Sequence, residues 1–253
     1  MHSRETTDIT GHVIMVTGAA SGIGRRVAAR LAEKGVIVAA CDKNLAALEA
    51  LRSEVGVSNL HTFEIDFLSD ESIYSCVNNI ESALGNLQAV MNCVGILGKN
   101  GMKVEDIELD DFDLVYRINL RGALVLTKAT IKGMADRGYG RILHIASISG
   151  KEGNPLLVAY SATKAGLIGM VKSIGKEYAT SGVTVNAMAP ALIQSPMTDS
   201  FSESQLTFLK SKIPMDRLGN TDEVVDLAAW ILSPACSFTT GFAFDLSGGR
   251  ATY

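Results

Sequence analysis

The sequence predicts an α/β protein built on a single, doubly wound parallel sheet of about seven strands, with helices on both faces. Two observations lead to this fold class. Short, continuous apolar runs, which are typical of strands buried on both faces, alternate with longer segments of helical periodicity along the whole chain. A glycine-rich turn also joins the first apolar run to the first helical segment, as in many sheets of this type.

Each element is predicted by its own pattern. Apolar and β-branched residues dominate the strand-like runs, and apolar faces mark the helices. The expected strands are residues 12–17, 36–41, 60–66, 87–93, 141–147, 183–189 and 242–246. The expected helices are residues 23–34, 45–55, 72–84, 109–136, 155–179 and 221–232. Gly35 stops the first helix, and Pro155 suits the first turn of the fifth.

One domain spanning residues 1–253 is the economical prediction, because no internal repeat, low-complexity tract or linker interrupts the alternation. Residues 1–11 are largely polar and are expected to form a flexible tail. Residues 191–214 form a long irregular region that contains Ser, Pro and Met. A loop of that length in a compact domain is often functional, so we expect a substrate loop or lid there.

Composition and charge exclude several classes of function. Hydrophobic residues make up 47% of the chain and charged residues 20%, an ordinary balance for a globular protein. The formal net charge of -4 provides no basic footprint for nucleic acid. No apolar run approaches the ~18 residues of a membrane span. The four cysteines and four histidines show no metal-ligand spacing, so we expect reduced thiols, no metal site and a cytoplasmic location.

The first candidate site is the turn Thr17–Gly24, which follows a strand and opens a helix. In this context glycines let the backbone approach a pyrophosphate, whose charge lies at the helix N-terminus. The spacing Gly-x-x-x-Gly-x-Gly differs from the commoner Gly-x-Gly-x-x-Gly, and a glycine-rich turn alone can be a mere connector. The residues expected to hold a dinucleotide here are Gly18, Ser21, Gly22, Ile23 and Gly24.

Asp42 strengthens the dinucleotide prediction. It ends the second expected strand, 18 residues after Gly24, where a carboxylate can accept hydrogen bonds from an adenosine ribose. The same carboxylate would repel a 2′-phosphate, which favours NAD over NADP. Lys43 is adjacent to Asp42, Arg25 and Arg26 are expected close by, and all three act against that preference; Asp42 can also be read as an ordinary turn residue.

Tyr160 and Lys164 form the second candidate site. On a helix their four-residue spacing places both side chains on one face. A phenol with a pKa near 10 becomes a useful base near pH 7 only if its pKa falls by roughly 3 units, or about 4 kcal/mol. An ammonium group about 4 Å away supplies roughly that amount at an effective dielectric constant near 20. The spacing alone is also that of an ordinary amphipathic helix.

Further motifs occur in register with the alternating elements. They are Asp66-Phe67, Asn92-Cys93-Val94-Gly95, Asn119, Ser147, Pro190-Ala191, Ile193 and Ser195. Together with the glycine turn and the Tyr160–Lys164 pair, they make the chain resemble the short-chain dehydrogenase/reductase family from about Gly11 to Gly249. Cys93, Val94 and Ala191 depart from the family pattern, but they replace no reacting group.

The resemblance implies a Rossmann-type fold, a dinucleotide-binding catalytic domain and an oxidoreductase that acts on CH–OH groups. It implies four catalytic residues: Tyr160 as general base or acid, Lys164 to lower its pKa and hold the nicotinamide ribose, Ser147 to orient the substrate oxygen, and Asn119 to anchor a water chain. It also implies NAD contacts by Asp66, Phe67, Asn92, Gly95, Tyr160, Lys164, Ile193 and Ser195.

The substrate prediction rests on polar residues beside the reacting groups. Ser149, Lys151, Glu152 and Asn154 suit a polyhydroxylated or carboxylated substrate, because buried polar groups need partners. The segment 150–155 is similar to that of family members that oxidise sugars and 2-keto-3-deoxy sugar acids. We expect Ser147, Ser149, Asn154 and Tyr160 to contact substrate, although the wall could instead face solvent.

The C-terminal residues 250–253 could reach a neighbouring subunit's pocket, as in some family members, with Arg250 as a carboxylate clamp. By the same resemblance, the long helices 109–136 and 155–179 pair across a two-fold axis in a homotetramer. The apolar residues Ala165, Leu167, Ile168, Val171 and Ile174 cover more of the second helix than one buried face needs.

Three alternatives stay open at this point. The chain also resembles 3-oxoacyl-carrier-protein reductases, which dock an acidic carrier through two arginines, but Val125 and Ser181 occupy the aligned positions. Polyols or other secondary alcohols are a second alternative. A non-catalytic NAD-binding sensor on the same fold is a third, although a pure binder has no need of a base.

Overall fold

The computed structural model describes residues 7–194 and 203–253 of the chain. Within these ranges, seven strands form one sheet in the order β3-β2-β1-β4-β5-β6-β7, and every neighbouring pair is parallel. The strands are β1 (Val13–Thr17), β2 (Ile37–Asp42), β3 (Leu60–Glu64), β4 (Ala89–Asn92), β5 (Gly140–Ile145), β6 (Val183–Pro190) and β7 (Ala243–Leu246). The predicted fold class is confirmed.

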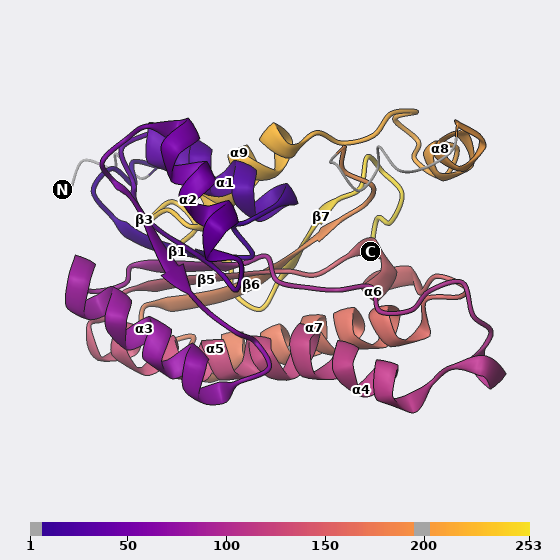
Figure 1. Ribbon diagram of the computed structural model, residues 1–253, viewed down its shortest axis with the longest axis horizontal. Coiled ribbons are helices and arrows are strands. Elements are labelled where there is room, and N and C mark those ends of the chain that lie inside the picture. Colours follow the sequence, from indigo (N-terminus) through magenta and orange to yellow (C-terminus); the bar gives the residue numbers. More distant parts are fainter. Residues whose placement is uncertain (1–6, 195–202) are drawn as a thin grey trace.

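Helices cover both faces of the sheet. Figure 1 shows α1, α2 and α9 above it and α3, α4, α5 and α7 below it. Their bounds are α1 (Gly22–Glu33), α2 (Leu45–Val55), α3 (Asp70–Leu84), α4 (Leu109–Tyr116), α5 (Gly122–Asp136), α7 (Val158–Glu177) and α9 (Thr221–Ile231). One core packs around Val27, Leu31 and Val225 on the first face, and a second around Leu126 and Val171 on the other.

The order of the strands positions the site. The chain winds outward from β1 to β3, then returns to place β4 on the other side of β1. At such a reversal the loops after the two central strands diverge to opposite faces and leave a crevice at their carboxyl ends, where ligands bind. Thr17 and Asn92 end these two strands and are paired in register.

Two predicted helices differ from those observed. The helix expected over residues 109–136 is interrupted by a π-helical turn, Arg117–Arg121, between α4 and α5. The helix expected from Pro155 begins at Val158, because Leu156 has φ +65° and cannot continue a right-handed helix. Pro155 therefore lies in a turn. A short helix before that turn, α6 (Ile148–Glu152), was not predicted.

Two predicted irregular segments also need correction. The region 191–214 contains a helix, α8 (Glu203–Lys210), and Ile193 forms a β-bridge with Gly219. The flexible tail predicted over residues 1–11 is wrong at its described end, because Ile9 is buried and the Gly11 N–H bonds to the Gly35 carbonyl at 3.0 Å. Residues 1–6 and 195–202 lie outside the described residues.

Among the helices of the described ranges, none has both the length and the apolar character needed to cross a membrane.

Candidate active site

The glycine turn lies at the carboxyl ends of the central strands, and its glycines are required there by geometry. Gly18 and Gly22 have φ +69° and +53°, a conformation that side-chain-bearing residues rarely adopt. A Cβ on Gly24 would stand 2.2 Å from the Gly18 carbonyl oxygen. Ser21 precedes α1 without capping it by a side-chain hydrogen bond, so the first amides of the helix keep their capacity to bind an anion. These residues fit a dinucleotide pyrophosphate.

Asp42 lies beside this turn at the end of β2. One carboxylate oxygen accepts a hydrogen bond from the Ala20 N–H at 3.2 Å, and the other accepts one from the Asn44 N–H at 3.0 Å. The carboxylate is thus both a turn residue, as the alternative reading supposed, and a support for the glycine turn. Because Asp42 is only half-buried, it keeps lone pairs for a further donor.

Arg25 and Arg26, two of the basic residues that would act against a preference for NAD, have partners elsewhere. Arg25 pairs with Glu54 at 2.6 Å. Arg26 forms a two-point ion pair with Asp222 at 2.8 and 2.9 Å. Both guanidinium groups are therefore engaged with carboxylates on other helices.

Asp66 and Phe67 follow β3 but differ in exposure. Asp66 is exposed, and one of its carboxylate oxygens accepts a bond from the Leu68 N–H at 2.9 Å. The Phe67 side chain is buried in the core, where its ring fills the space that a Cβ on Gly122 would need. The predicted cofactor contact of Phe67 stays a prediction.

Asn92 belongs to a buried polar chain that the sequence analysis did not foresee. Its amide oxygen accepts from Thr17 Oγ1 at 2.8 Å, and its amide nitrogen lies 3.2 Å from His144 Nδ1. His144 Nε2 lies 3.0 Å from Thr127 Oγ1, which itself donates to the Ala123 carbonyl. This pattern requires a neutral His144 that accepts at Nδ1 and donates at Nε2. Burial lowers the pKa of His144 to about 3.

Gly95, Asn119 and Lys164 meet beyond the end of β4. A Cβ on Gly95 would stand 3.0 Å from Lys164 Nζ and 3.5 Å from Asn119 Oδ1. Asn119 is fully buried on the π-helical turn. Its amide oxygen accepts from the Ile96 N–H at 2.8 Å and its amide nitrogen donates to the Ile96 carbonyl at 2.9 Å. Asn119 thus fixes the loop after β4.

Tyr160 and Lys164 lie on one side of α7, as their spacing predicts, and the lowering of the Tyr160 pKa by Lys164 stays a prediction. Lys164 Nζ donates to the Ile145 carbonyl at 2.6 Å and lies 5.7 Å from the centroid of the Tyr160 ring. Burial raises the pKa of Tyr160, with the Ser147 side chain acting in the opposite direction. Burial lowers the pKa of Lys164 to about 8, because a cation loses hydration there.

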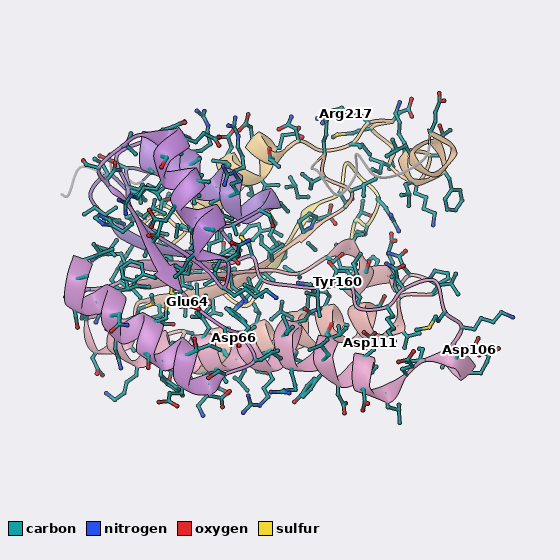
Figure 2. All side chains as sticks on the ribbon, viewed as in Figure 1. Glu64, Asp66, Asp106, Asp111, Tyr160 and Arg217 are labelled. Atoms are coloured by element: carbon teal, nitrogen blue, oxygen red, sulfur yellow. The ribbon has the colours of Figure 1, made fainter. Side chains whose placement is uncertain are left out.

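Ser147 ends the loop after β5 and is the N-cap of α6, where its Oγ accepts from the Ser149 N–H at 3.1 Å. It is therefore a cap as well as a neighbour of Tyr160. In the view of Figure 2, Tyr160 lies near the end of the sheet, between the loop that contains Arg217 and the helix that contains Asp111.

The predicted polar wall follows Ser147 and has partners within the chain. Ser149 is buried, and its Oγ accepts from Asn154 Nδ2 at 2.6 Å. Lys151 pairs with Asp245 at 2.9 Å and Glu152 with Arg250 at 2.7 Å. The wall therefore contacts the C-terminal segment of its own chain.

A cavity of about 310 Å³ lies between residues 191–192, residues 213–219 and the loop after β7, and Leu192, Met215 and Leu246 are among its lining residues. Ile193 lies beside it but is buried in the core. Ser195, a predicted nicotinamide contact, is outside the described residues. In the described ranges, no group of three or more His, Cys, Asp or Glu side chains is placed to hold a metal ion.

The site residues that the sequence analysis missed are His144, Thr127 and Gly122. His144 carries a weak signal, since it is a polar residue between the apolar residues Leu143 and Ile145 of a strand. Thr127 and Gly122 carry none, because their importance depends on contacts with residues far away in the sequence.

The comparisons with known proteins agree with this geometry. A family model described as Enoyl-(Acyl carrier protein) reductase matches residues 18–250, from the glycine turn to the C-terminal segment. The chain belongs to the short-chain dehydrogenase/reductase family. As predicted, it is an oxidoreductase with the fold of that family.

Three relatives show how similar the chain is to characterised proteins. It is 41% identical over 96% of both chains to the 2-dehydro-3-deoxy-L-rhamnonate dehydrogenase (NAD(+)) of Sphingomonas sp. (strain SKA58). It is 37% identical to the 3-oxoacyl-[acyl-carrier-protein] reductase FabG of Rickettsia prowazekii (strain Madrid E), over 96% of this chain and 98% of FabG. A solved structure described as the crystal structure of gox2181 superposes with a TM-score of 0.90 at 29% identity, over 96% and 97% of the two chains.

The buried histidine makes stability depend on pH. The unfolded chain binds a proton at His144 near the ordinary pKa of 6.5, whereas the folded chain does so only near 3. The stability from neutral His144 is therefore complete above pH 6.5 and is lost as the pH falls toward 3. Glutamine can supply one acceptor and one donor without titrating. We expect His144→Gln to flatten the acid side of the stability curve by up to about 1.4 kcal/mol per pH unit.

The measurement is the free energy of unfolding in urea at several pH values between 4 and 7. A variant with the same pH dependence as the wild type would show that His144 is not held neutral in the folded protein.

Proposed function

We propose that the chain oxidises a secondary hydroxyl of a sugar or 2-keto-3-deoxy sugar acid with NAD. The supporting observation is the polar lining beside Ser147 and Tyr160, where Ser149 is buried and bonded to Asn154. Such a lining suits a substrate that carries several oxygens. The relative from Sphingomonas, named as an NAD-dependent dehydrogenase of a sugar acid, supports the same substrate class at 41% identity.

Tyr160, Ser147 and Lys164 each have a separate role in this reaction. When bound, the nicotinamide ring supplies the carbon that accepts a hydride. Tyr160 takes the proton from the substrate hydroxyl, while Ser147 Oγ holds that oxygen in place. Lys164 is protonated at neutral pH, since its pKa is about 8, and its charge stabilises the phenolate that forms. One of its N–H groups is used by Ile145, which leaves donors for the ribose.

The cation–phenol interaction has to be larger in the reacting complex than in the free protein. In this structure burial raises the pKa of Tyr160, so proton removal is unfavourable near neutral pH. Asn119 keeps the loop at Ile96 in place. Its role in a water chain stays a prediction.

NAD rather than NADP is supported by the surroundings of Asp42. Its carboxylate lies at the end of β2, and the guanidinium groups of Arg25 and Arg26 are paired with Glu54 and Asp222. No charge from these two arginines is left to neutralise a 2′-phosphate. The relative with 41% identity is also named as NAD-dependent.

Reduction of 3-oxoacyl groups on a carrier protein is the second candidate, favoured by the FabG relatives. Of the two positions aligned with docking arginines, Val125 is buried in the core, so its identity says nothing about how a carrier docks. Ser181 is then the one aligned position whose residue argues against docking of a carrier protein. Its hydroxyl donates to the Tyr178 carbonyl at 2.7 Å.

A homotetramer is supported by exposed apolar side chains, although by few of those first considered. Leu167, Ile168 and Val171 are buried within their own chain, which corrects the expectation that they cover a second face, whereas Ala165 is exposed and Ile174 is half-buried. Several other exposed apolar side chains lie on α4 and α5 and near β7. They include Leu109, Leu114, Tyr116, Leu124, Trp230, Phe238 and Phe242. A single catalytic domain and a cytoplasmic location stay predictions.

Removal of the phenol oxygen tests the catalytic assignment. We expect Tyr160→Phe to lower kcat for alcohol oxidation by about 10²–10⁴-fold, because the general base is lost. NADH formation on a panel of sugar acids and polyols is the measurement, and NAD binding by fluorescence is the control. Wild-type binding of NAD without turnover of any alcohol would favour a sensor, and full activity of the variant would exclude Tyr160 as the base.

Removal of the Asp42 carboxylate tests the cofactor assignment. Wild-type kcat/KM should be higher with NAD than with NADP. Asp42→Ala should narrow this ratio by about tenfold, the effect of about 1.4 kcal/mol of lost repulsion. Both cofactors are compared at the same ionic strength, because charge repulsion is screened by salt. Equal use of the two cofactors by the wild type would contradict the assignment.

The assembly is tested by light scattering. We expect a mass four times that of the 26.8 kDa chain at micromolar concentration. Leu124→Glu, which places a charge on the exposed face of α5, should shift the mass downward. A monomeric wild type would rule out the tetramer.

A further inference from the structure

The C-terminal segment, residues 245–253, folds back onto α6. Figure 1 shows the C-terminus next to this helix. Lys151 Nζ donates to Asp245 Oδ2 and to the Ala251 carbonyl, both at 2.9 Å. The Tyr253 hydroxyl donates to the Lys151 carbonyl, and the Lys151 ammonium lies 5.0 Å from the centroid of the Tyr253 ring. The last residues of the chain are thus fixed on the helix that begins after Ser147.

These contacts place Arg250 against the polar wall. Its guanidinium pairs with Glu152 at 2.7 Å and donates to Asn154 Oδ1 at 3.1 Å. Only 9% of the Arg250 side chain is exposed. Because Glu152 already neutralises Arg250, the expectation that Arg250 clamps a carboxylate in a neighbouring subunit is not supported. Its contacts point to a role within its own chain.

The contact with Arg250 sets the orientation of the Asn154 amide. A guanidinium can only donate hydrogen bonds, so the atom of Asn154 that faces it must be the oxygen. The amide nitrogen therefore faces Ser149 and donates to its Oγ at 2.6 Å. Ser149 Oγ accepts this bond, and its own hydrogen must point to another acceptor.

Ser149 is close to the reacting groups. Only 5% of the residue is exposed, and its N–H donates to Ser147 Oγ at 3.1 Å. The Asn154 N–H donates to Ser161 Oγ at 3.1 Å, next to Tyr160 on α7. No residue of the described ranges accepts a hydrogen bond from Ser149 Oγ. A buried hydroxyl with a free hydrogen is costly unless a ligand accepts that hydrogen.

We infer that Arg250, acting through Asn154, is a positioning residue that fixes the Ser149 hydroxyl as a hydrogen-bond donor toward the substrate. The group selected at that position is an oxygen that only accepts, such as the carboxylate or the keto oxygen of a 2-keto acid. The location of the substrate in this inference rests on the proposed function. The direction of the hydrogen bonds rests on the contacts of Arg250 and Asn154 alone.

Asn154→Asp is the sharpest test, because it keeps the pairing with Arg250 and reverses the direction of the next bond. A carboxylate only accepts, so the Ser149 hydroxyl must then donate to the introduced carboxylate and is lost to the substrate. We expect KM for a 2-keto-3-deoxy sugar acid to rise by about tenfold, the usual effect of one lost hydrogen bond, with kcat and the melting temperature nearly unchanged. KM for an alcohol without a carboxylate or keto group should stay the same.

Variants of Arg250 separate positioning from mere stability. Arg250→Lys should behave like the wild type, since an ammonium group also only donates. Arg250→Met removes the donor that sets the orientation of the Asn154 amide. It should therefore raise KM for the sugar acid by about threefold or more. Arg137→Met is the matched control. Arg137 also pairs with a carboxylate, that of Glu81 at 3.3 Å, and donates to a backbone carbonyl, that of Leu87. These contacts lie just before β4. It should leave KM unchanged.

Neutron diffraction of the free protein in D₂O gives a readout that needs no substrate. We expect the amide deuterons of Asn154 to face Ser149 and the Ser149 deuteron to point away from Asn154. The opposite arrangement, or an Asn154→Asp enzyme with unchanged KM for the sugar acid, would overturn the inference. A wild type with the expected deuterons but no turnover of sugar acids would overturn the proposed function instead. In that case KM of each variant is measured for the best substrate of the panel and for an analogue of it that lacks the carboxylate or keto oxygen.

Discussion

The buried ammonium group of Lys164 is the constraint on which the site depends. It lies in the interior with 3% exposure, and an unpartnered cation there would be strongly unfavourable. The Ile145 carbonyl at the end of β5 supplies one partner. The group also crowds Gly95, where a Cβ would approach it to 3.0 Å. It helps to keep His144 neutral, because a second positive charge nearby is disfavoured.

The central strands position this cation and the cofactor region together. β1 and β4 are neighbours although they are far apart in the chain, and the Thr17 hydroxyl donates to Asn92 across that pair. The chain of bonds through Asn92 and His144 continues to α5 on one face of the sheet. The same strand ends carry the glycine turn on the other side. A change at His144 would therefore be expected to reach both the turn after β4 and the helix below it.

The catalytic groups and the specificity groups are held by different parts of the chain. Tyr160 and Lys164 belong to α7, a long helix packed on the core. Ser149 belongs to α6 and Asn154 to the turn after it. The C-terminal segment holds both in place, because Arg250 donates to Asn154 and Lys151 of α6 donates to the Ala251 carbonyl. A division of this kind lets the substrate preference change through terminal residues while the proton-transfer groups stay in place.

The sequence by itself determined the alternation of strands and helices, the parallel sheet, the glycine turn and the Tyr160–Lys164 spacing. These features depend on periodicity and on local backbone geometry, which are written in neighbouring residues. The prediction failed where a local signal competed with a distant contact. Pro155 looked like a helix start, yet the Leu156 carbonyl accepts from the distant Gly101 N–H at 3.1 Å, and Leu156 at φ +65° delays the helix to Val158.

Only the tertiary structure decided how the side chains are paired. It showed that Phe67 fills the core against Gly122, that burial raises the pKa of Tyr160, and that Arg250 binds Glu152 and Asn154. Each of these depends on residues that are far apart in the chain and meet only after folding. Burial and charge pairing are properties of such contacts, so no spacing along the sequence can reveal them.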